Sequence, residues 1–267
     1  MAATIPKIRF LTAWFCPYAH RATLALEHHR GRVEYESVEA LGWQKNNDDE
    51  WYYHWKSDEL KQMNPSALVP TFVLEGYRSV YESLVCMDYV DAISQATGTS
   101  RLVPEDPYWA AQCRIWSDKV NRECCSPYYG VLVRQDDTER REHFENLLSG
   151  LRRFSKQLAQ TDGPVFLPGG QLSVVDLTLV PWAFRFYVLE HYRGPKFAIP
   201  SEPELEHYRQ WYDHVMNLDS VKRTLPDKDR YLEHICKYAD GSARSKVANA
   251  VRRGVAAHDL DDEKDEF

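Results

Sequence analysis

Short runs of alternating apolar and polar residues recur in the first eighty positions of the chain. Such alternation places every second side chain on one face of an extended segment, as in a half-buried β-strand. The alternating runs fall at residues 7–10 and 33–38, and two further short runs, the mostly apolar 68–74 and then 79–81, also predict strands. The last two runs are separated by a turn that contains Gly76, so they predict a β-hairpin.

Helical spacing of apolar residues fills the gaps between these strands. One segment opens at Cys16–Pro17, and another opens at Glu82–Ser83 and ends near Gly98. Residues 41–63 are polar and rich in tryptophan and tyrosine, and they predict only an irregular helix over 57–63. The order β-α-β-α-β-β-α, with Cys-Pro at the first strand–helix junction, is typical of a thioredoxin-type layer.

Strand patterns almost vanish in the second half of the chain, where helical spacing dominates. Helices are expected over residues 108–133, 139–160, 173–189 and 204–216, so the fold class is α/β followed by an all-α helical bundle. Pro127 favours a break in the first helix, and Pro181 a kink in the third. Ser173 and Asp176 predict a capping box, which is a structural role.

These patterns divide the chain into four parts. We assign 6–97 to a thioredoxin-like domain, 98–107 to a linker, 108–238 to the helical domain and 239–267 to a C-terminal extension. Within the extension, residues 242–257 are expected to form one helix that carries Lys246, Arg252 and Arg253. Residues 259–267 are acidic and are expected to be disordered.

Composition narrows the class of protein. The 267-residue chain has a net charge of −7. It therefore lacks the overall basic surface that is typical of proteins that bind nucleic acid or an acidic membrane. Its 6 cysteines follow neither a disulfide framework nor the spacing of a zinc site, which is typical of reduced thiols. The start lacks the features of a signal peptide, and no apolar run is long enough to span a membrane. We therefore expect a cytoplasmic protein that binds no metal.

Cys16 has the most distinctive setting of these cysteines. It precedes the first helix, where unpaired N–H groups and the helix dipole favour a thiolate and lower the pKa of a thiol. Pro17 then takes the first helical position, where proline is best tolerated. The alternative is a buried, inert cysteine. The pattern favours a reactive thiol.

Several motifs, in a fixed order, carry a resemblance to a known family. They are Phe15-Cys16-Pro17-Tyr18-Ala19-His20-Arg21, Asn64-Pro65-Ser66-Ala67-Leu68-Val69-Pro70, Tyr81-Glu82-Ser83, and Leu172-Ser173-Val174-Val175-Asp176 followed by Pro181-Trp182. On these motifs the chain resembles a cytosolic glutathione transferase, closest to the cysteine-dependent omega and lambda classes. The resemblance runs from about residue 6 to 238, and it implies a homodimer.

The resemblance implies a glutathione site in the first domain, with Cys16 as the catalytic residue and Phe15 beside it. Val69–Pro70 is expected to offer backbone groups to the cysteinyl part of glutathione, and in the family this X-Pro bond is cis. Glu82–Ser83 is expected to hold the γ-glutamyl amine and carboxylate. Lys56 stands where omega-like members place a lysine that meets the glycine carboxylate.

A pocket for a second substrate is also implied, with Tyr18, Tyr128 and Trp211 at its wall. Each of these assignments has a plainer alternative. Trp211 at helical spacing is first a core residue, and Val69–Pro70 is also compatible with a plain strand entry. Glu82–Ser83 is also compatible with a simple helix cap, and Lys56 with a solvated side chain.

A cysteine at this position implies thiol–disulfide chemistry. Its thiolate attacks the glutathionyl sulfur of a mixed disulfide, and a second glutathione resolves the Cys16 adduct. Ala19 stands three residues on, so no internal dithiol is available there. The leading hypothesis is a glutathione-dependent thiol transferase, acting in deglutathionylation or in reduction of dehydroascorbate.

Three other functions stay open at this point. Conventional conjugation of glutathione to electrophiles would use Tyr18 or Thr12 to activate the glutathione thiol. Glutathionyl-hydroquinone reductases share the Cys-Pro-aromatic-Ala-His-Arg run. A non-catalytic glutathione-transferase-like binding module is the alternative of another class, and assays of retention on immobilised glutathione and of disulfide exchange separate it from the enzymes.

Overall fold

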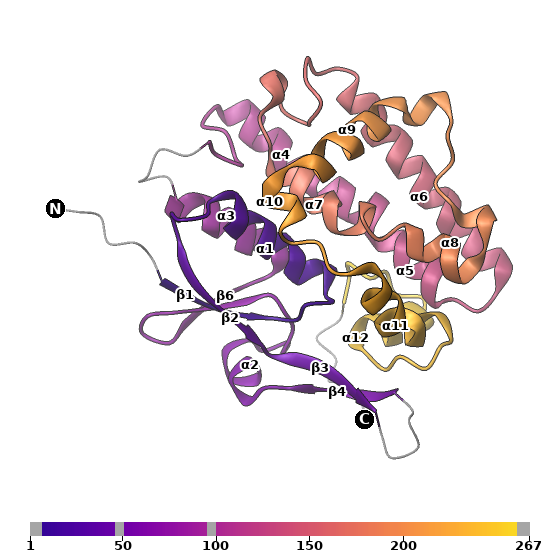
Figure 1. Cartoon of the computed structure of the whole chain (residues 1–267), viewed down its shortest axis with the longest axis horizontal. Coiled ribbons are helices and arrows are strands. Elements are labelled where there is room, and N and C mark those ends of the chain that lie inside the picture. Colours follow the sequence, from indigo (N-terminus) through magenta and orange to yellow (C-terminus); the bar gives the residue numbers. More distant parts are fainter. Residues whose placement is uncertain (1–6, 46–50, 95–99, 261–267) are drawn as a thin grey trace.

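The computed structural model describes residues 7–45, 51–94 and 100–260, with a sheet-containing domain beside a group of helices (Figure 1). The sheet holds β1 (Lys7–Thr12), β2 (Glu34–Glu39), β5 (Thr71–Leu74) and β6 (Arg78–Tyr81) in the order β2-β1-β5-β6. β1 is parallel to β2 and antiparallel to β5, and β5 and β6 form the expected hairpin. The thioredoxin-like class predicted from the sequence is confirmed.

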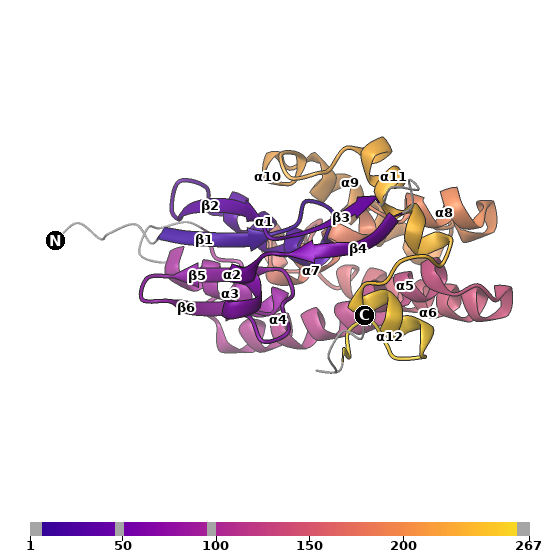
Figure 2. The same ribbon diagram turned by 90° about the horizontal axis from the view of Figure 1, so that it is seen from below.

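Two helices separate this sheet from the helical domain. They are α1 (Pro17–His28) and α3 (Ser83–Ser94), which pack on each other, and α1 also packs on α7 (Val174–Ala183) of the helical domain (Figures 1 and 2). The Asp91 carboxylate on α3 accepts hydrogen bonds from His29 Nε2 at 3.0 Å and from the Leu102 N–H at 2.7 Å. It thereby ties α3 to the segment that enters the helical domain. The expected end of this helix at Gly98 lies outside the described residues.

The segment over residues 41–63 departs from the prediction. It forms an antiparallel hairpin, β3 (Leu41–Lys45) with β4 (Trp51–Lys56), and then α2 (Asp58–Met63). Helix α2 agrees with the predicted helix, but the hairpin was not predicted. Neighbouring aromatic residues in β4 give no alternation of apolar and polar positions, so the period-2 pattern of a strand is absent.

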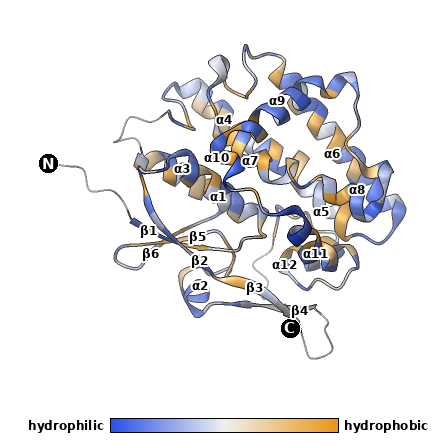
Figure 3. Cartoon of the chain, viewed as in Figure 1, coloured by the Kyte–Doolittle hydropathy of each residue, from blue (hydrophilic) through white to orange (hydrophobic). Residues whose placement is uncertain are grey.

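The second half of the chain is helical, as predicted. Its α-helices are α4 (Pro107–Val120), α5 (Ser126–Val133), α6 (Asp137–Leu158), α7 (Val174–Ala183), α8 (Tyr187–Arg193), α9 (Glu206–Asn217), α10 (Asp219–Lys222), α11 (Lys228–Ala239) and α12 (Lys246–Arg252). Figure 3 shows hydrophilic and hydrophobic residues side by side on α6 and α9, as in amphipathic helices. The apolar faces of α6 and α9 meet where Phe154 packs edge-on against Trp211, with 5.3 Å between ring centroids.

The two prolines act differently from each other. The predicted break at Pro127 is wrong, because a π-helical turn over Asn121–Cys125 joins α4 to α5 and places this proline in the first turn of α5. An N–H is not required there. Pro181 lies inside α7, which ends at Ala183, two residues later. The predicted helix over 173–189 is therefore divided into α7 and α8.

The predicted capping box at the start of α7 is confirmed. Ser173 Oγ accepts from the Asp176 N–H at 3.4 Å, and Asp176 Oδ2 accepts from the Ser173 N–H at 2.8 Å. The other carboxylate oxygen of Asp176 accepts from Trp211 Nε1 at 2.9 Å and from the Phe166 N–H at 3.1 Å. Asp176 therefore connects α7, α9 and the loop before α7 inside the core.

The C-terminal helix is shorter than predicted. Ser245 caps the start of α12 by accepting from the Ala248 N–H at 3.1 Å. The helix ends at Arg252, because Gly254 takes a φ of +90°, which the α-helix does not allow. The helix predicted over 242–257 was therefore too long at both ends, because the prediction overlooked the cap at Ser245 and the stop at Gly254.

Two general features of the described residues bear on function. None of their helices is both long enough and apolar enough to pass through a bilayer. In the same part of the chain, no three or more His, Cys, Asp or Glu side chains come together as a metal-binding cluster.

Candidate functional site

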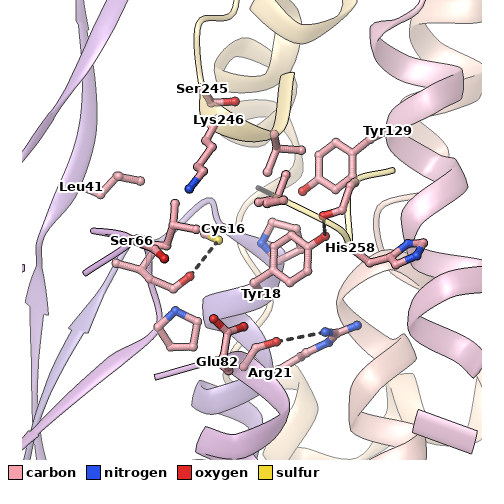
Figure 4. Close-up of a pocket in the computed structure, with 18 of the residues that line it drawn as sticks. Cys16, Tyr18, Arg21, Leu41, Ser66, Glu82, Tyr129, Ser245, Lys246 and His258 are labelled. Atoms are coloured by element: carbon pink, nitrogen blue, oxygen red, sulfur yellow. Dashed lines mark hydrogen bonds between the residues drawn. The ribbon is translucent and has the colours of Figure 1, made fainter. Parts of the chain in front are cut away.

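A cavity lies where the thioredoxin-like domain meets the helical domain. It encloses about 410 Å³, which falls in the range of roughly 300–1,000 Å³ typical of small-molecule sites. Residues at the starts of α1 and α3, in the loop before β5, in α5 and α11, and in the chain after α11 form its wall (Figure 4). Segments distant in sequence therefore meet around one space.

Cys16 is the N-cap residue of α1, as the sequence predicts. Its backbone is extended, with φ −77° and ψ 118°, and Pro17 begins the helix. The thiol donates to the Val69 carbonyl oxygen, with 3.9 Å between Sγ and O (Figure 4). Val69 and Pro70 line the cavity, and the peptide bond between them is cis, as the family resemblance implied.

The pKa of the Cys16 thiol differs from the sequence-based prediction. Burial raises this pKa above its ordinary value. The backbone N–H groups of Tyr18 and Ala19 act in the opposite direction, as the helix-terminus argument requires. The positive charges of Arg185 and Arg21 also favour the thiolate. Desolvation outweighs these effects, and the sequence pattern gives no sign of what buries the thiol.

This balance predicts the pH dependence of Cys16 alkylation in the ligand-free protein. Because the pKa is raised, the thiol stays largely protonated at neutral pH, and the labelling rate should keep rising up to and beyond the usual thiol range near pH 8.5. Iodoacetamide labelling followed by peptide mass spectrometry measures this profile, with a free cysteine peptide as reference. A plateau already reached at about pH 7 would contradict the prediction.

Glu82 and Ser83 both line the cavity, and Glu82 lies at the end away from Lys246 (Figure 4). Glu82 has a φ of +69°, a left-handed conformation that is uncommon outside glycine and is enriched at functional sites. Behind them lies Arg21, which is 1% exposed and donates from Nη1 to Ser83 Oγ at 3.0 Å. Because Ser83 Oγ accepts this bond, its own hydroxyl proton is directed elsewhere, which suits the binding of an anion.

The structure places Phe15 and Lys56 differently from each other. Phe15 lines the cavity and stacks on His234, with 3.9 Å between the ring centroids. Lys56 is the last residue of β4, opposite Leu41 in the hairpin register, and it is not part of the described cavity wall. Lys56 therefore lies next to a wall residue but outside the described wall, and its role in glutathione binding stays a prediction.

Of the residues predicted for the second-substrate pocket, one lines the cavity and two do not. Tyr18 lines the cavity, and its hydroxyl donates to the Ala257 carbonyl oxygen at 3.0 Å. Tyr128 and Trp211 are both 0% exposed and lie outside the described wall, so their predicted pocket role is corrected. Trp211 belongs to the core because its indole N–H is bound to Asp176. The helical domain supplies other aromatic rings to the wall, namely Tyr129, Tyr231 and Tyr238.

Sequence reasoning missed two groups of wall residues. Arg21 closes the Cys-Pro-Tyr-Ala-His-Arg run, and its position one helical turn after Pro17 was an available signal. The wall also includes residues from the C-terminal extension, which the pattern left without a role. These are Ser245, Lys246, Val247, Ala257, His258 and Leu260.

Two protein-family models match this chain, one in each half. The model described as "Glutathione S-transferase, N-terminal domain" matches residues 15–93, and "Glutathione S-transferase, C-terminal domain" matches residues 137–214. Among curated relatives, glutathione transferase GST 23 of Zea mays is 27% identical, over 84% of this chain and 92% of its own length. Glutathione S-transferase U27 of Arabidopsis thaliana is 24% identical, over 86% and 92%.

Solved structures agree with these matches. Glutathione transferase Omega 3C of Trametes versicolor has a TM-score of 0.70 and is 26% identical, over 89% of this chain and 92% of that one. Rice GST1, solved in complex with glutathione, shares the fold with a TM-score of 0.72 and 24% identity, over 90% of this chain and 100% of its own. With family models matched in both halves and relatives matched along most of their length, this chain belongs to the glutathione transferase family.

Proposed function

We propose that this protein is a glutathione-dependent thiol transferase of omega type that uses Cys16 to form a mixed disulfide with glutathione. One observation carries the proposal. The Cys16 thiol faces a cavity whose wall also holds Val69 on one side and Glu82–Ser83 at one end. A thiol in this place is itself a nucleophile toward disulfides, whereas a hydroxyl would only hydrogen-bond to the thiol of glutathione.

The γ-glutamyl end and the central cysteinyl part of glutathione both fit this arrangement. Its γ-glutamyl ammonium group would face the Glu82 carboxylate, and the adjacent carboxylate would accept the Ser83 hydroxyl and lie near Arg21. Its cysteinyl backbone would pair with Val69 in the manner of an added strand. These contacts bring the glutathione sulfur to Cys16.

The reaction then proceeds in two exchanges. The Cys16 thiolate attacks the glutathionyl sulfur of a mixed disulfide, the old S–S bond breaks, and the departing thiolate takes up a proton. A second glutathione thiolate attacks the glutathionyl sulfur of the adduct, which yields oxidised glutathione and restores Cys16. Arg21 and Arg185 favour the thiolate form in both exchanges, which offsets part of the effect of burial.

Conventional conjugation has weaker support as a second candidate. The Tyr18 hydroxyl is engaged with the Ala257 carbonyl oxygen, and burial raises its pKa, so it is poorly placed to activate a glutathione thiol. Thr12 is buried in β1 and is not part of the described cavity wall. The relatives named as glutathione transferases keep conjugation as the alternative for assay.

The homodimer implied by the resemblance also stays a proposal. Large apolar side chains are exposed on both domains, with Tyr77 at 86% in the first and Tyr108 at 63% in the second, and Val85 and Ile115 also exposed. Burial of such side chains against another protein would be favourable, because it removes apolar surface from water. A second copy of the chain is the partner that we propose.

The proposed function is tested by incubation with oxidised glutathione and mass spectrometry of the intact and digested protein. We expect one glutathionyl adduct at Cys16, removed by added reduced glutathione. The half-buried Cys236 serves as control, and a Cys236→Ser variant should label as the wild type does. An adduct that persists in a Cys16→Ser variant, or no adduct in the wild type, would refute the proposal.

A further inference from the structure

The C-terminal segment, defined here as residues 241–260, is fastened to the cavity by several hydrogen bonds. Tyr238 at the end of α11 donates to Ser245 Oγ at 2.8 Å, and Arg134 donates from Nη1 to the Arg252 carbonyl oxygen at 3.3 Å. Tyr18, next but one after Cys16, donates to the Ala257 carbonyl oxygen at 3.0 Å. The C-terminal segment is thus attached to α11, to the end of α5 and to the helix that carries the reactive thiol.

Lys246 projects from this segment into the cavity. It follows the cap residue Ser245 at the start of α12, and its half-buried side chain lines the cavity beside Leu41 and Ser66. Figure 4 shows the ammonium group directed toward Cys16, with Glu82 and Arg21 at the opposite end of the cavity. In the described part of the chain, no hydrogen bond or ion pair engages Lys246 Nζ.

The charges along the cavity are therefore unequal at its two ends. Glu82 is the one carboxylate in the described wall, and it lies at the end where Arg21 supports Ser83. Lys246 gives the other end, beyond Cys16, a positive charge without a partner of opposite sign among the described residues. A ligand that matches this pattern carries both charges at one end, sulfur in the middle and an anion at the far end.

Glutathione has that pattern, so we propose that Lys246 binds its glycine carboxylate. This inference rests on the proposed function, since it takes glutathione as the ligand. With the γ-glutamyl end at Glu82–Ser83 and the sulfur at Cys16, the glycine carboxylate reaches the side of the cavity where Lys246 lies. Lys56, the lysine suggested by resemblance, is not part of the described wall.

A consequence follows for the C-terminal segment. Because Lys246 belongs to this segment, its ion pair with bound glutathione adds an attachment between the segment and the thioredoxin-like domain. Glutathione binding and closure of the segment over Cys16 therefore stabilise each other. The C-terminal segment, left without a role by the sequence pattern, becomes part of the substrate site.

The test compares two ligands and three variants by titration calorimetry on the full chain. The ligands are glutathione and its glycine monoethyl ester, which lacks only the negative charge at the glycine end. For the wild type, we expect the ester to bind about tenfold more weakly, as for loss of one partly buried ion pair. Lys246→Gln should bind glutathione as weakly as the wild type binds the ester, and should bind both ligands equally.

Two control variants test whether the positive charge at Lys246, rather than the one at Lys56, binds the glycine carboxylate. Lys246→Arg keeps a cation and should keep most of the discrimination between the two ligands, and Lys56→Gln should keep all of it. If Lys246→Gln still discriminates, the inference is overturned, whereas adduct formation at Cys16 would leave the proposed function intact. If the wild type binds neither ligand, the inference and the proposed function fail together. An unchanged thermal unfolding midpoint shows that Lys246→Gln is folded.

Discussion

Replacement of Cys16 by alanine is expected to lower glutathione-dependent disulfide exchange by at least about 10³-fold, to the uncatalysed rate. The reason is that Cys16 is the one cysteine in the described cavity wall and the nucleophile of the proposed mechanism, and a methyl group forms no mixed disulfide. In the proposed mechanism each turnover passes through the Cys16 adduct, so the variant has no partial route. The assay follows release of a thiol from its glutathione mixed disulfide, with oxidised glutathione as the second product.

A serine at the same position separates the two candidate chemistries. Cys16→Ser also removes exchange, but its hydroxyl, at the start of α1, is able to donate a hydrogen bond to the thiolate of glutathione. We therefore expect Cys16→Ser to conjugate glutathione to a chlorinated nitroarene faster than the wild type, and Cys16→Ala not to. Exchange that survives in both variants would show that Cys16 is not the nucleophile.

The elements around Cys16 were predictable because their signals are local. The Cys-Pro pair, the apolar runs of β1 and β5, and the Ser173–Asp176 cap each act within a few residues of sequence. The structure contains them at the predicted places. Local signals of this kind survive in the fold because tertiary packing does not compete with them.

The composition of the site was less predictable because it depends on contacts between distant segments. Tyr129 faces the cavity and Tyr128 does not, although both follow the same run of sequence. The π-helical turn before α5 holds more residues per turn than an α-helix, so it changes which of the following side chains face inward. No pattern in the sequence predicted this turn. The raised pKa of Cys16 has the same origin, since its burial involves parts of the chain that a helix-terminus argument does not include.

The role of the C-terminal segment was the least predictable feature of the site from sequence alone. Its sequence resembles a basic stretch followed by an acidic one, and the family motifs stop before it. Its attachment through Tyr18, Tyr238 and Arg134 brings Lys246 to the cavity. A lysine that looks solvated in sequence thereby becomes a candidate ligand for a carboxylate, while Lys56 lies outside the described wall.

Replacement of Asp176 by alanine is expected to cause the largest loss of stability, about 3 to 5 kcal/mol in the free energy of unfolding. Asp176 is 0% exposed, and its carboxylate accepts from Ser173, Trp211 and Phe166. Alanine leaves the Trp211 and Phe166 N–H groups buried without an acceptor, in addition to the loss of the helix cap. Urea unfolding followed by tryptophan fluorescence measures the change.

Asp176→Asn is the matched control for this prediction. Its amide oxygen still accepts a hydrogen bond, and burial raises the pKa of Asp176, so loss of the negative charge itself costs less than loss of the acceptor. We expect a loss of about 1 to 2 kcal/mol. Trp211→Phe removes one of the donors, and its effect should not add to that of Asp176→Ala, because both variants break the same hydrogen bond. Fully additive effects, or a loss below about 1 kcal/mol for Asp176→Ala, would show that this buried carboxylate does not hold α7 and α9 together.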